Sequence, residues 1–71
     1  MQEADKYLLK IGENIRLKRK EKGYSQQELA DNMNVAASTV HRIEKGMFNT
    51  TILTLKAIAE NLEVDIAELL K

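Results

Sequence analysis

Apolar side chains recur every three or four residues in five successive segments of the chain, which is the spacing of amphipathic helices. The segments cover approximately residues 3–22, 26–33, 36–45, 52–62 and 66–70. Their inner positions are Leu8, Ile11, Ile15, Leu29, Ala30, Met33, Val40, Ile43, Ile52, Leu55, Ile58, Ala59, Leu62, Ile66, Leu69 and Leu70. The pattern therefore predicts an all-α fold of five helices around one small core.

The first segment contains Gly12, and a glycine inside a helix costs about 1 kcal/mol relative to alanine. Such a glycine either allows close packing against another element or marks a break in the helix. A break would separate an N-terminal extension, residues 1–9, from the first helix proper. Both interpretations remain open from the residues alone.

The second and third segments have clear start and stop signals. Ser25 can accept a hydrogen bond from the first helical turn, and Glu28 completes a capping box. Asn34 tolerates the left-handed backbone that ends a helix sharply, and Gly46 ends the next helix. Two short helices joined by a tight turn form a helix-turn-helix, whose second helix can enter a DNA major groove.

The composition is that of one helical domain, residues 1–71. Hydrophobic residues make up 44% of the chain, and proline and cysteine are absent, which excludes a disulfide framework and fits a reducing cytoplasm. No apolar run approaches the roughly 20 residues of a membrane span. We therefore expect a cytoplasmic protein with no membrane partner.

The net charge of zero is unequally distributed. Residues 6–22 carry seven cationic and two acidic side chains, whereas residues 51–71 carry two cationic and four acidic ones. A local charge of +5 against −2 can present a basic face to phosphate. The alternative is an ordinary solvated helix face.

The residue types do not favour an enzyme. The chain has one histidine, no cysteine and no glycine loop of the phosphate-binding kind, so we expect no catalytic residue, no metal and no cofactor. The single histidine, His41, is interpreted as an exposed polar residue.

From Ile11 to Leu70 the chain resembles the DNA-binding domain of the phage repressor/Cro family of bacterial regulators. The resemblance is carried by IGENIR at 11–16, Arg19, KG at 22–23, SQQELA at 25–30, VAASTVHRIEKG at 35–46, the apolar pattern of 49–64 and IAELL at 66–70. It implies a five-helix lambda-repressor-like domain in which helices 2 and 3 form the helix-turn-helix.

The resemblance also implies roles for individual residues. The positions that touch base edges are Ala37, Ser38 and Arg42, and those that touch the DNA backbone are Gln26, Thr39, Asn49 and Thr50. Arg42 is the strongest base reader, because a guanidinium can bind O6 and N7 of guanine with two hydrogen bonds. In the family, an arginine at position 19 pairs with the glutamate at position 44, which would tie the first helix to the third. The alternative for Arg19 and Glu44 is two unrelated surface charges.

The sequence departs from the family pattern in two places. Ala36 stands where a serine or threonine usually caps the recognition helix, and Ala37 replaces a longer polar reader. In the loop after that helix, Met47 and Phe48 occupy positions where cationic residues are common. Phe48 is interpreted as a cap of the core, with an exposed aromatic that awaits a partner as the less favoured alternative.

The family commonly forms two-fold dimers through the C-terminal helix, and Ile66 and Leu70 are the expected contacts. The alternative is an ordinary core helix in a monomer. The leading hypothesis is a dimeric transcriptional regulator that binds double-stranded DNA on a pseudo-palindrome with half-sites about 34 Å apart. Restriction-modification controllers, phage regulators and antitoxins, the last with a toxin as second partner, all fit. The alternative function is a protein-interaction module without a DNA role.

Overall fold

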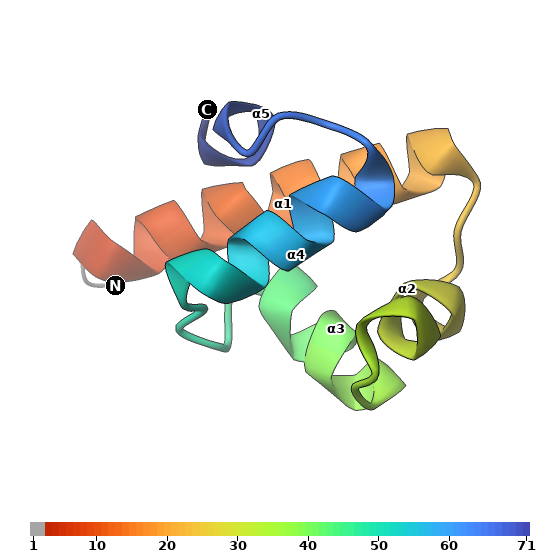
Figure 1. Cartoon of the computed structure of the whole chain (residues 1–71). Coiled ribbons are helices and arrows are strands. Elements are labelled where there is room, and N and C mark those ends of the chain that lie inside the picture. Colours follow the sequence, from red (N-terminus) through yellow and green to blue (C-terminus); the bar gives the residue numbers. More distant parts are fainter. Residues whose placement is uncertain (1–2) are drawn as a thin grey trace.

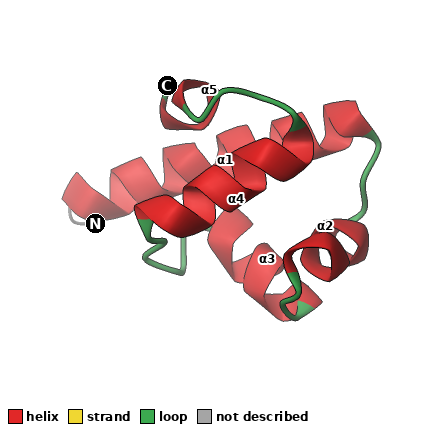
Figure 2. Ribbon diagram, in the orientation of Figure 1, coloured by secondary structure: helices red, strands yellow, loops and turns green. Residues whose placement is uncertain are grey.

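The computed structural model describes residues 3–71 and forms five helices in that range (Figure 1). These are α1 (Glu3–Lys22), α2 (Gln26–Met33), α3 (Ala37–Glu44), α4 (Ile52–Leu62) and α5 (Ala67–Leu70). The segments between the helices are loops and turns (Figure 2). The expected all-α, five-helix fold is therefore confirmed. No helix in this range is long and apolar enough to cross a membrane.

The α2–α3 pair lies on one side of α1 and α4, and α5 packs on the opposite side (Figure 1). Each helix contributes to one core, whose buried apolar side chains are Ile15, Leu29, Ala30, Val40, Ile43, Leu55, Ile58, Ala59, Leu62 and Leu69. The inner stripes read from the sequence are thus largely right. Ile52 and Leu70 are exceptions, at 61% and 48% exposure.

Both ends of α2 and the start of α3 have the geometry that their residues predict. The amide of Glu28 donates to Ser25 Oγ at 3.0 Å, and the amide of Ser25 donates to Glu28 Oε1 at 2.9 Å, which completes the capping box. Asn34 ends α2 in the left-handed region, with φ 59°. Ala36 provides no side-chain cap for α3, as its methyl group requires.

Gly12 is explained by close packing. Helix α1 is continuous from Glu3 to Lys22, so the interpretation of Gly12 as a break is wrong for this range. A methyl group at Gly12 would lie 2.5 Å from the carbonyl oxygen of Glu44 and 2.6 Å from that of Ile43. The last turn of α3 therefore rests directly on the backbone of α1. Residues 1–2 of the expected extension lie outside the described range.

Candidate nucleic-acid interface

The recognition face is the side of α3 that points away from the core. Val40, Ile43 and Glu44 are buried, and the helical period leaves Ser38 and Arg42 exposed. Two other expected DNA contacts lie nearer the core. Ala37 is half-buried and packs against the core cluster, and Thr39 is half-buried.

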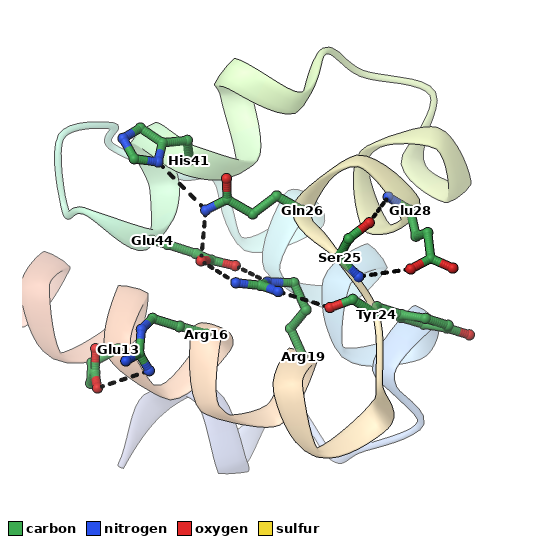
Figure 3. A network of polar contacts seen from close by, with 9 residues as sticks. All are labelled: Glu13, Arg16, Arg19, Tyr24, Ser25, Gln26, Glu28, His41 and Glu44. Carbon is green, nitrogen blue, oxygen red and sulfur yellow. Dashed lines mark hydrogen bonds and ion pairs between the residues drawn. The ribbon is translucent and has the colours of Figure 1, made fainter.

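A buried ion pair joins α3 to α1 (Figure 3). Arg19 Nε donates to Glu44 Oε2 at 2.6 Å, and Arg19 Nη2 donates to Glu44 Oε1 at 3.1 Å. The two residues are only 7% and 6% exposed. The third nitrogen, Nη1, donates to the carbonyl oxygen of Tyr24 at 2.8 Å. This is the pair that the family resemblance implies, and the planar guanidinium engages helix and turn together.

Gln26, at the start of α2, belongs to the same network (Figure 3). Its Nε2 donates to Glu44 Oε1 at 3.0 Å and lies 3.5 Å from Nδ1 of His41. A side-chain amide has two N–H donors, so one donor of Gln26 remains for a phosphate or for His41. The network therefore connects α1, α2 and α3 through one carboxylate. Sequence reasoning did not link Gln26 or His41 to the ion pair.

Beside this network lies an open cleft of about 430 Å³ between α1 and the end of α3. Its charged and polar lining consists of Glu13, Arg16, Arg19, Lys20, Gln26, His41, Glu44 and Lys45. Arg16 Nη1 lies 3.7 Å from Glu13 Oε1, and Arg19 is neutralised by Glu44, whereas no ion pair within residues 3–71 engages Lys20 or Lys45. The cleft therefore has an excess of positive charge that suits an anionic group.

The loop between α3 and α4 differs from expectation at Phe48. The ring is 37% exposed and belongs neither to the core nor to the side chains packed against it, so its interpretation as a core cap is wrong. Instead, Cζ of Arg42 lies over the ring, 5.6 Å from its centre. The loop turns sharply at Gly46, which has a φ of 71°. In the same loop Asn49 is exposed, and the hydroxyl of Thr50 donates to the carbonyl oxygen of Phe48 at 3.3 Å.

A second surface feature lies on α4 and the turn that follows it. An open groove of about 310 Å³ is lined mainly by apolar side chains, among them Ile52, Leu53, Val64 and Ile66. Leu53 is 75% exposed, and Ile66 is half-buried with contact to the core. Leu70, the other expected dimer residue, is exposed at the end of α5. Leu53 was missed from sequence, although a leucine off the inner stripe of an amphipathic helix is a usable signal.

Ion pairs surround the exposed end of α5. Nζ of Lys18 lies 3.7 Å from Glu68 Oε1, and Lys71 also pairs with Glu68. The hydrogen bond from Lys71, together with its charge, lowers the pKa of Glu68, and the same contact raises the pKa of Lys71. Lys18 and Glu68 are half-buried and Lys71 is exposed, so water screens both pairs and they contribute little to stability. Within residues 3–71 no group of three or more potential metal ligands is present.

The profile of the helix-turn-helix family (HTH_3) matches residues 15–69. The HTH-type transcriptional regulator SlrR of Bacillus subtilis is 43% identical over 60 residues, which cover 83% of this chain and 40% of SlrR. This chain thus corresponds to less than half the length of that relative.

Solved structures show the same architecture. The restriction-modification controller protein C.AhdI from Aeromonas hydrophila superposes with a TM-score of 0.83 at 32% identity, covering 87% of this chain and 94% of that chain. The DNA-binding domain of BldD superposes with a TM-score of 0.86 at 25% identity over 100% of both chains.

Proposed function

The chain belongs to the helix-turn-helix family, and from this premise we propose that it is a sequence-specific, DNA-binding regulator of transcription that acts in the cytoplasm as a homodimer. The observation that carries the proposal is the way α3 is attached to the rest of the fold. Its inner side is fixed to α1 and α2 by the Arg19–Glu44–Gln26 network, while Ser38 and Arg42 are exposed on its outer side. A rigidly held helix with exposed polar side chains is what major-groove recognition requires.

In this proposal Arg42 reads a guanine with two hydrogen bonds, and Ser38 contacts a neighbouring base or phosphate. The methyl group of Ala37 packs partly against the core, so little of it remains to contact a thymine. The DNA backbone beside these bases is contacted by Thr39, Asn49 and Thr50.

Further phosphate contacts are proposed at the positively charged cleft between α1 and the end of α3. Gln26 lies at the N-terminus of α2, where backbone amides and the helix dipole favour an anion, and it lines the cleft together with Lys20 and Lys45. A DNA phosphate at the mouth of the cleft would find two lysines that have no counterion in the described structure. These lysines can supply the phosphate contacts that cationic residues at positions 47 and 48 would otherwise make.

The dimer is proposed from the apolar groove. Leu53, Ile52 and Ile66 present apolar surface at one end of the molecule, with Leu70 exposed on α5. A two-fold contact would cover such a patch and set two recognition helices for half-sites about one helical turn, 34 Å, apart. Nothing in the described part of the chain favours a toxin protein as a further partner.

The test is selection of duplexes from a randomised pool, followed by fluorescence anisotropy at two salt concentrations. Wild type is expected to enrich one duplex family and to bind it more weakly at high salt, because phosphate contacts release counterions. Arg42→Ala should lose about 1–3 kcal/mol of discrimination at one G·C pair. Lys45→Gln should keep the preference and reduce the salt slope by about 1.

The opposite result would be weak binding that is indifferent to sequence and to Arg42. It would favour the alternative function, a protein-interaction module that uses the exposed apolar groove, and would exclude the regulator proposal.

A further inference from the structure

The loop after α3 folds back onto Arg42. Gly46, with φ 71°, reverses the chain, and the amide of Met47 donates to the carbonyl oxygen of Arg42 at 2.9 Å. The next residue, Phe48, places its ring beneath the guanidinium, 5.6 Å from Cζ. Thr50 donates its hydroxyl to the carbonyl oxygen of Phe48 at 3.3 Å. The loop therefore contacts Arg42 twice, through a hydrogen bond to its backbone carbonyl and through the ring beneath its guanidinium.

The segment between Arg42 and Phe48 packs closely against α1. A Cβ at Gly46 would lie 3.0 Å from the backbone of Leu9, so the loop rests against α1 at this point. At Gly12 the last turn of α3 comes closer still to the same helix, since a Cβ there would lie 2.5 Å from the carbonyl oxygen of Glu44. The backbone between Arg42 and Phe48 is thus held against one helix.

The contact restricts Arg42 without consuming its hydrogen-bonding capacity. An exposed arginine carries about 2 kcal/mol of rotamer entropy, part of which must be lost when it binds a base. A cation–π contact favours one position of the guanidinium, and it uses none of the five N–H donors. The ring can therefore prepare Arg42 for a guanine before DNA arrives.

We propose that Phe48, which lies outside the recognition helix, is a positioning residue that holds Arg42 for guanine and so helps to set sequence specificity. This inference rests on the proposed function, because it gives Phe48 its role through Arg42. It assigns the loop between α3 and α4 a part in base discrimination rather than in core packing.

The experiment measures a ratio of dissociation constants. The denominator is the dissociation constant for the duplex that wild type enriches. The numerator is the dissociation constant for the same duplex after the G·C pair that is sensitive to Arg42→Ala has been changed to A·T. The variants are Phe48→Leu, Phe48→Tyr and, as a matched control in the same loop, Met47→Ala. Partial unfolding weakens binding to both duplexes equally, so the ratio does not respond to a merely structural role.

Phe48→Leu is expected to lower the ratio by about two- to fivefold, which corresponds to an exposed cation–π contact. Phe48→Tyr retains a ring face and should keep the wild-type ratio. Met47→Ala removes exposed apolar surface without touching the ring contact, and it should also leave the ratio unchanged.

The inference is overturned if the ratio stays at the wild-type value in Phe48→Leu while Arg42→Ala removes the preference for the G·C pair. The proposed function would then remain intact. A higher ratio in Phe48→Leu would mean that the ring withholds Arg42 from DNA, which also overturns it. If Arg42→Ala changes no base preference, Phe48 has no reader to position and the inference fails. If wild type enriches no duplex, the proposed function and this inference fail together.

Discussion

Gly12 is a residue at which local preference and tertiary packing oppose each other. Helix propensity favours alanine at this position by about 1 kcal/mol. The backbone of α3 leaves no room for a methyl group, since a Cβ would lie 2.5 Å from the carbonyl oxygen of Glu44. Overpacking of a closely packed site costs about 1–3 kcal/mol, so packing decides.

Gly12→Ala is therefore expected to lower the melting temperature, by about 5–15 °C for a domain of this size. Thermal unfolding followed by circular dichroism measures the change. Gly23→Ala is the control: φ is +85° and nothing lies within 4 Å of the added Cβ, so only backbone strain is introduced. A higher melting temperature in Gly12→Ala would show that α3 does not rest on this residue.

Individual residues also show where sequence reasoning stops. Ser25, Glu28 and Asn34 were predicted correctly because caps act on amides within a few positions of the same chain. The surroundings of Phe48 could not be predicted, because they depend on how a loop leaves α3. The exposure of Ile52 depends likewise on which element covers α4.

At the scale of elements, α1, α2 and α3 are joined through a single carboxylate. Glu44 accepts hydrogen bonds from Arg19 and from Gln26, and both members of the ion pair are buried. Removing one partner of a buried pair leaves an uncompensated charge, whereas replacing both by apolar residues of similar volume is often tolerated. Pairing across helices could be expected from the family resemblance but not from spacing along the chain.

Arg19→Ala should therefore destabilise the fold by about 3–5 kcal/mol, and the double variant Arg19→Met/Glu44→Leu should be more stable than Arg19→Ala. Urea unfolding of wild type, Arg19→Met, Glu44→Leu and the double variant gives the coupling free energy. Additive effects of the two single substitutions would contradict the pair.

Helix α4 ends at an unfavourable residue. Glu63 takes φ 57°, a left-handed conformation that favours glycine or asparagine, and it pairs with Lys22 on the surface. The left-handed cost exceeds the value of an exposed ion pair, which is about 0–1 kcal/mol. Sequence reasoning did not find this strain, since glutamate is not a typical helix C-terminus.

Glu63→Gly is expected to raise the free energy of unfolding by about 0.5–1 kcal/mol. Chemical denaturation is the measurement, and Lys22→Gln serves as the control that reports the ion pair alone. A loss of stability in Glu63→Gly larger than that of Lys22→Gln would mean that the ion pair outweighs the backbone strain.

At the scale of the whole molecule, two parts of the surface differ in character. The α2–α3 side carries the exposed polar face of α3 and the basic cleft, whereas the groove beside α4 presents Leu53 and Ile66. The helix order and the helix-turn-helix could be predicted from periodicity and end signals. The groove could not, because it forms only where α4 and the following turn meet in three dimensions.

Leu53→Lys is expected to shift the proposed homodimer toward monomer, because it places a charge in the apolar contact. Sedimentation velocity measures the shift. Binding to a full pseudo-palindrome should weaken while binding to a single half-site stays unchanged. Lys56→Gln, a change at a polar position of the same groove, is the control. An unchanged sedimentation coefficient in Leu53→Lys would place the dimer contact elsewhere.

Because α3 is attached through its inner side, its outer face is a suitable place to redesign DNA specificity. Its attachment depends on Gly12, Glu44 and the buried side chains, and the outward side chain of Ser38 makes no hydrogen bond to the rest of residues 3–71. A library at the outward positions can therefore be screened for new target sequences without rebuilding the scaffold. Position 48 belongs in that library, since each new side chain at 42 will need its own neighbour.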